Sequence, residues 1–107
     1  MKPETNNLWE KALGYLEEAE QLSKDKEFHE AMRKAIEAFV AALQAINALS
    51  REMEMPELWV IGENAGLAWL EFMDSKHYTP KETVEWIRGR LKWLSDELPL
   101  DTFRPLK

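Results

Sequence analysis

The sequence lacks cysteine and has only two histidines among its 107 residues. Without cysteine there are no disulfide bonds, thiolate nucleophiles or cysteine-ligated zinc sites, and this composition is typical of a reducing compartment. No apolar run approaches the ~20 residues of a membrane-spanning helix. The first residues also lack the apolar segment of a signal peptide. We therefore expect a cytoplasmic protein with no membrane segment.

The sequence also lacks a complete set of residues for a catalytic or metal site. A di-iron bundle needs Glu-x-x-His pairs, and no Glu lies three residues before His29 or His77. We expect both histidines to be structural, His29 on a helix surface and His77 in a loop. The four glycines are not clustered in a phosphate-binding turn. We therefore expect no catalytic residue, no metal and no cofactor.

Basic residues are in the minority, because the net charge is −6. A net acidic surface repels nucleic acid unless its basic groups cluster. One local cluster, Arg88, Arg90 and Lys92, is interleaved with Trp86 and Trp93. Basic and aromatic side chains together can grip single-stranded nucleic acid. The simpler interpretation is that these residues form a solvated helix face. RNA binding through them is the alternative interpretation.

In four segments of the sequence, apolar residues recur at intervals of three and four positions. These segments predict helices over about 8–23, 27–50, 56–74 and 80–98, followed by an irregular tail over 99–107 that Phe103 anchors. A chain of this length forms one domain. The pattern predicts a single all-α domain over residues 1–107, a four-helix bundle built from two antiparallel αα-hairpins.

Local signals mark two helix starts. Asn6 or Asn7 can cap the first helix, because a short polar side chain accepts from free N–H groups of the first turn. Thr79, Pro80 and Glu82 form a capping-box pattern at the start of the last helix. The 27–50 segment leaves only a narrow polar strip, so it is the central helix or meets a second subunit.

Two of the predicted helices carry a second apolar stripe that alternates tryptophan and glycine. Each glycine inside a helix costs about 0.8–1 kcal/mol relative to alanine, so its presence needs a packing reason. A glycine beside a tryptophan makes a notch that another helix can enter. Three interpretations are open: the notches are filled within the monomer, they meet a partner, or the helix breaks near Gly62 and Gly66 and lines a pocket there. The stripe residues are Trp59, Gly62, Gly66, Trp69, Trp86, Gly89 and Trp93.

The segment 8–49 resembles the first helical hairpin of HEPN-type domains. The resemblance rests on Tyr15-Leu16-Glu17-Glu18-Ala19-Glu20, a short charged turn, and the run from Phe28 through Leu43. Ribonucleases of that family carry an Arg, four to six residues and then a His late in the domain, and this sequence has no such motif. The resemblance therefore implies a non-catalytic bundle that dimerises or pairs with a nucleotidyltransferase-like partner.

Three functions follow as hypotheses. The first is a non-enzymatic protein–protein interaction module, a homodimer that uses the Trp/Gly stripe residues. The second is an RNA-binding or degenerate RNA-processing domain that uses Arg88, Arg90 and Lys92. The third is a small-molecule sensor with a pocket at the glycines of the 56–74 helix.

Overall fold

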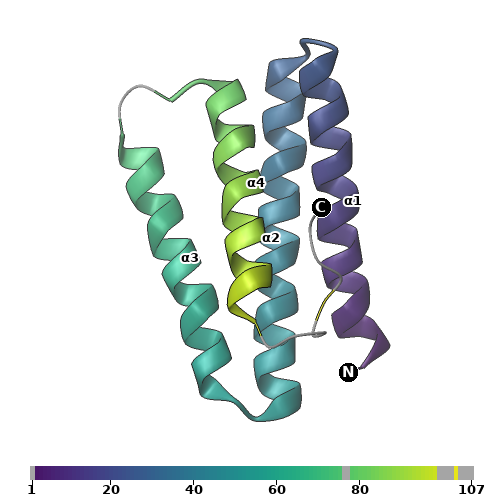
Figure 1. The fold of residues 1–107 in the computed structure, drawn as a ribbon, viewed down its shortest axis with the longest axis vertical. Helices are drawn as coiled ribbons and strands as arrows, with labels where there is room; N and C mark the ends of the chain where they lie inside the picture. The colour runs from purple at the N-terminus through teal and green to yellow at the C-terminus, as the bar shows by residue number, and fades with distance from the viewer. Residues whose placement is uncertain (1, 76–77, 99–102, 104–107) are drawn as a thin grey trace.

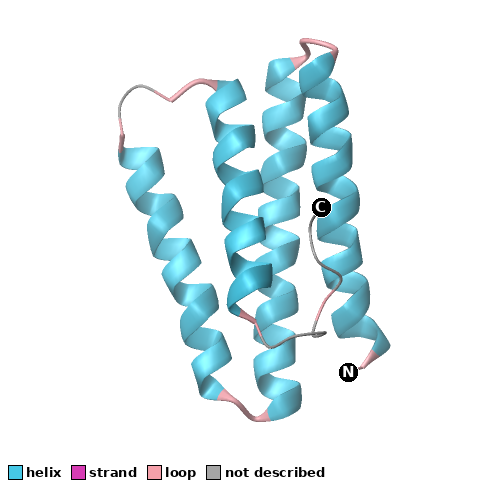
Figure 2. Ribbon diagram, viewed as in Figure 1, coloured by secondary structure: helices cyan, strands magenta, loops and turns pink. Residues whose placement is uncertain are grey.

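The protein is an all-α bundle in the computed structural model, which describes residues 2–75, 78–98 and 103. Within these residues there are four helices and no strand (Figure 2). Their bounds are α1 Pro3–Lys24, α2 Phe28–Met53, α3 Pro56–Asp74 and α4 Pro80–Glu97. Successive helices run in opposite directions (Figure 1). The predicted all-α helical bundle is confirmed.

Helix α2 lies at the centre of the bundle. A central position was one of the two explanations that the sequence offered for its narrow polar strip; the other was contact with a second subunit. It packs against all three other helices and most extensively against α1, whereas α3 and α4 make few contacts with each other. The α1–α2 hairpin is therefore tightly packed. The second predicted hairpin is not a packed pair to the same degree, because α3 and α4 each rest mainly on α2.

The hydrophobic core lies between α1, α2 and α4. Its largest fully buried side chains include Trp9 and Leu16 of α1, Ile46 of α2 and Leu91 of α4. Small residues let the helices approach closely, since α2 buries the alanine stripe along its length: Ala31, Ala35, Ala38, Ala42 and Ala45. Helix α3 buries only Leu58, Gly62 and Ala65. The outermost helix therefore adds least to the core.

Helix α1 begins five residues earlier than the sequence pattern predicted. Pro3 occupies the first turn, where its missing N–H leaves no bond unmade, and Glu4 is favourable near the helix N-terminus. Asn6 and Asn7 therefore lie inside the helix and do not cap it. The backbone N–H of Lys2 donates to a carboxylate oxygen of Glu52, which ties this extra turn to the end of α2.

Just after the C-terminal ends of α1 and α2, charged residues occupy the left-handed position where glycine is usual. Lys26 and Glu54 adopt left-handed backbone conformations, with φ of 62° and 53°. At each end, two backbone N–H groups close a Schellman pattern, for example Met55 N to the Ser50 carbonyl at 3.0 Å. This cap carries α2 to Met53, three residues beyond the predicted end. The chain's glycines are all inside helices instead.

The start of α4 confirms Thr79 as the N-cap, but the Glu82 carboxylate accepts from the Thr79 hydroxyl and not, as in a capping box, from the Thr79 backbone N–H. The Glu82 backbone N–H donates to Thr79 Oγ1 at 3.2 Å, and that hydroxyl donates to Glu82 Oε1 at 3.1 Å. Phe103 is buried and stacks on Trp9, with ring centroids 4.8 Å apart, so its predicted anchoring role is also confirmed. The rest of the predicted tail, 99–102 and 104–107, lies outside the described residues, as does His77.

Candidate interaction surface

Helix α3 presents large apolar side chains to solvent. Among the described residues, six large hydrophobic side chains are exposed, and four of them lie on α3. We call these four the α3 apolar face: Trp59 (50% exposed), Val60 (47%), Leu67 (53%) and Leu70 (59%). At about 100° of rotation per residue, the four positions fall within about a third of the helix circumference, so these side chains form a strip along one side of α3. Glu63 lies on the same side, between Val60 and Leu67. Isolated exposed leucines are ordinary, but several large apolar side chains exposed on one side of a helix mark an interaction surface.

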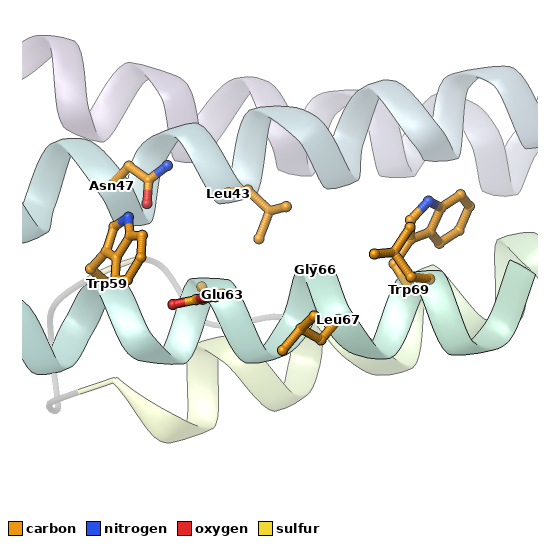
Figure 3. A pocket seen from close by; sticks show the side chains of 9 residues that line it. Leu43, Asn47, Trp59, Glu63, Gly66, Leu67 and Trp69 are labelled. Atoms are coloured by element: carbon orange, nitrogen blue, oxygen red, sulfur yellow. The ribbon is translucent and has the colours of Figure 1, made fainter.

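A groove of about 460 Å³ runs between α2 and this strip. Leu43 and Asn47 of α2 form one wall, and α3 supplies the other wall and the floor. Figure 3 shows Trp59 beside Asn47 at one end, Trp69 at the other, and Leu43 between them. The lining is predominantly apolar. The groove is therefore shaped to receive apolar side chains from outside the chain.

The two glycines of α3 have different roles. A Cβ atom on Gly62 would lie 3.3 Å from Ile46 Cγ2, so the absence of a side chain there lets α3 approach α2. A Cβ atom on Gly66 would meet nothing within 4 Å. Gly62 is thus filled within the monomer, whereas Gly66 leaves the groove open. Helix α3 is continuous across both, so the pocket does not arise from a break in the helix.

Two of the candidate tryptophans pack inside the molecule. Trp69 and Trp86 lie 5.5 Å apart between ring centroids, and both contact Phe39 of α2. Phe72 stacks on Trp86 at 5.1 Å. This aromatic cluster joins α3 to α4 and α2. One edge of Trp69 still reaches the groove, so this residue takes part in both the cluster and the groove lining.

The remaining candidates on α4 lie apart from the groove. Trp86, Gly89 and Trp93 line a separate shallow depression with Arg90. A Cβ atom on Gly89 would meet nothing within 4 Å, so none of the four described helices fills that notch. The structure therefore divides the seven stripe residues between two surfaces. Trp59, Gly62, Gly66 and Trp69 belong to the groove, and the other three belong to α4.

The three basic residues of α4 each contact a different group of the chain. The Arg88 guanidinium forms an ion pair with Glu20 of α1. Arg90 lies over the rings of Trp86 and Trp93, at 5.2 and 5.1 Å from their centroids. Lys92 Nζ lies 3.2 Å from Asp96 Oδ2. Each predicted nucleic-acid contact residue therefore has a contact within the chain.

A charged bridge crosses the seam between α1 and α2. Lys34 Nζ lies 3.4 Å from Glu18 Oε2 and 3.7 Å from Glu37 Oε2. The Lys34 ammonium also sits over the Tyr15 ring, 5.3 Å from its centroid. The hydrogen bond to Glu18, together with the charges of Glu18 and Glu37, raises the pKa of Lys34 above its ordinary value of 10.5. This bridge is structural and lies away from the groove.

The sequence pattern missed part of this surface. Val60, Leu67 and Leu70 are not among the Trp/Gly stripe residues, and Leu43 comes from another helix. The signal that does point to them is the composition of α3, which is apolar on most sides of the helix and more apolar than the other three. A helix that is apolar all round is either surrounded or has an unfilled face.

No family model, curated protein or solved structure matches this chain. No helix in the described part of the chain is long and apolar enough to cross a membrane. Across residues 2–75, 78–98 and 103, no three His, Cys, Asp or Glu side chains gather as metal ligands. His29 is exposed on α2.

Proposed function

We propose that the protein is a non-enzymatic helical module that binds another protein surface along the α3 apolar face and the α2–α3 groove. One observation carries the proposal: the most apolar helix of the bundle is the one that buries the fewest residues. Its exposed side chains do not serve the core. Apolar area that folding leaves open is available for binding, where its burial is favourable.

Tryptophan at the groove supports a binding role. Trp59 is half exposed at one end of the groove, and Trp69 closes the other end. Tryptophan is enriched among the residues that dominate binding energy at protein interfaces, because it buries a large area and keeps one polar N–H. A partner side chain placed at Gly66 would lie between the two rings.

The decisive variant for this proposal is Leu67→Gln combined with Leu70→Gln, which removes apolar surface and keeps a good helix former without adding charge. If both leucines serve binding, the free energy of unfolding should change by no more than ~1 kcal/mol, the sum of two ordinary surface substitutions. Urea unfolding of the full chain measures it. A matched control is Leu91→Gln, a buried position where the same change should strongly destabilise the protein. A loss above ~2 kcal/mol in the double variant would make these leucines structural and remove the proposal.

Self-association at high concentration is the simplest form of such binding, and the homodimer predicted from the sequence is one hypothesis for it. Two-fold dimers are the commonest soluble oligomers. Light scattering at high micromolar concentration decides it. The Cβ atom of Gly66→Leu would meet nothing within 4 Å, so the leucine should enter the open notch and weaken a dimer that uses the groove while circular dichroism stays helical. A clean monomer would remove the homodimer but leave hetero-association.

A small-molecule site is the second candidate, because the groove volume lies within the ~300–1,000 Å³ range of ligand pockets. Thermal melts with a panel of apolar compounds test it. A compound that raises the melting temperature of the wild type but not of Gly66→Leu would support this candidate.

Two further hypotheses have less support. RNA binding through Arg88, Arg90 and Lys92 has no favourable observation, because these side chains are separately engaged. Salt-dependent retention of RNA would revive it. The HEPN-type resemblance of residues 8–49 remains a hypothesis about ancestry.

A further inference from the structure

The charge of α3 has a single sign. All four of its charged residues are acidic: Glu57, Glu63, Glu71 and Asp74. The whole stretch 52–75 contains no lysine or arginine. All four side chains are exposed, and no ion pair joins them to a basic group of the described residues. Their negative charge is therefore not neutralised within the described chain.

These carboxylates lie among and beside the residues of the α3 apolar face. Glu63 lines the groove itself and lies four residues before Leu67. Glu71 lies four residues after Leu67, and Asp74 lies four residues after Leu70. Side chains four apart are neighbours on a helix surface. A partner that contacts the apolar side chains of this strip therefore also meets negative charge within the strip and at its end.

The groove suits a helix better than an extended peptide. The described residues contain no strand whose free edge could pair with an added strand, and the helix backbones are already hydrogen-bonded internally. A docked extended segment would lose water from its N–H and C=O groups without replacement, whereas a helix satisfies its own. From Trp59 to Leu70 the strip spans about 16 Å, three turns of helix.

We propose that the occupant of the groove is an amphipathic helix of a partner protein with Lys or Arg residues flanking its apolar face. This inference rests on the proposed function and names the chemistry of its partner. Opposite charges around an apolar contact steer association and reject partners of the wrong charge. A second copy of α3 fits poorly, because it would bring four more carboxylates against the first four. An anionic membrane or nucleic acid is repelled for the same reason.

The experiment uses three synthetic helical peptides of about 15 residues, each with the same leucine face. Their flanking positions carry lysine, glutamine or glutamate. Titration into the full chain is followed by calorimetry and by the NMR signals of the Trp59 indole and the Leu67 and Leu70 methyl groups. The lysine peptide should shift these signals and bind about tenfold more tightly than the glutamine peptide at low salt. The glutamate peptide should bind most weakly, and near 0.5 M salt the three should converge.

A charge reversal separates the groove from general attraction to an acidic protein. Glu71→Lys should remove most of the preference for the lysine peptide. Glu17→Lys makes the same change in net charge at an exposed position of α1, so it should leave the preference intact. If both variants lose the preference equally, the attraction belongs to the net charge and the inference is wrong.

The remaining outcomes distinguish this inference from the proposed function. Equal binding of all three peptides at Leu67 and Leu70 would overturn the basic partner and keep the binding surface. A dimer that protects Leu67 and Leu70 in the free chain would make a second copy the occupant, again overturning only the inference. No shift at Trp59, Leu67 or Leu70 with any peptide, in a chain that stays monomeric, would overturn both.

Discussion

Helices α3 and α4 have nearly the same length, 19 and 18 residues, and both rest on α2. Helix α4 buries Ile87, Leu91 and Leu94 completely. Helix α3 is the more apolar of the two, yet its only large buried side chain is Leu58. In this molecule the apolar content of a helix therefore does not measure its share of the core. The apolar residues of α3 need a second explanation, and binding supplies one.

The difference comes from how the apolar residues are distributed around each helix. In α4 most of them follow one stripe that the bundle contact buries, and only Trp86 and Trp93 lie beside it as partly buried side chains. In α3 they surround most of the helix, and a single contact with α2 covers only one side. The other side is left exposed because no further helix of the described chain reaches it.

Truncation of a leucine on each helix should give the largest contrast. Leu91→Ala in α4 should cost about 2–5 kcal/mol, because it removes a fully buried side chain and leaves a cavity. Leu70→Ala in α3 should cost under ~0.5 kcal/mol, because that side chain is 59% exposed. Urea unfolding measures both. Similar losses at the two positions would show that α3 contributes to the core as α4 does.

The glycine pair of α3 sharpens the comparison within one helix. Gly62→Leu should destabilise by about 1–3 kcal/mol, because its side chain would collide with Ile46. Gly66→Leu should stabilise the free protein by about 0.5–1 kcal/mol, because it adds helix propensity at an open position. Thermal melts of both variants check the signs. Destabilisation by Gly66→Leu would mean that the groove is filled in the free protein.

The cap of α4 has no counterpart on α3. Thr79→Ala should destabilise by about 0.5–2 kcal/mol, because the Glu82 N–H then loses its acceptor. Thr79→Ser keeps the hydroxyl and should retain most of the stability. Met55 at the start of α3 makes no side-chain cap bond, so α3 has no comparable contribution. An unchanged Thr79→Ala melt would mean that α4 frays at its first turn in solution.

We expect the smallest effect on stability from the charged bridge between α1 and α2. The described residues have no such bridge between α2 and α3. Because its pKa is raised in the folded state, Lys34 stabilises the fold fully below its ordinary value of 10.5. This contribution is lost as the pH rises through the higher folded-state pKa. The stability difference between wild type and Lys34→Gln should therefore shrink at alkaline pH. A difference that stays constant would assign the effect of Lys34 to packing.

Much of the bundle could be predicted because helix signals are local. Thr79, Pro80 and Glu82 lie within one turn, so the start of α4 was readable from spacing alone. The early start of α1 was missed because Pro3 and Glu4 favour a helix without offering a capping side chain. The late end of α2 was missed because Glu54 takes a left-handed conformation that its residue type does not signal.

The candidate surface was only half predictable, because it depends on contacts between helices. Trp59 and Gly66 were identified from the sequence as notch residues. Nothing local distinguished them from Trp69 and Gly62, which the fold places against Phe39 and Ile46. Which of two similar stripes faces α2 is decided by tertiary packing.

The solvent accessibility of leucine methyl groups shows whether the α3 apolar face is open in the free protein. A soluble paramagnetic probe added to the full chain at low micromolar concentration relaxes exposed methyl signals in NMR spectra. We expect strong relaxation at Leu67 and Leu70, and protection at the buried Leu91 and Leu94. Protection of Leu67 and Leu70 in a chain that light scattering shows to be monomeric would mean that the α3 apolar face is covered within the monomer and is not a binding surface.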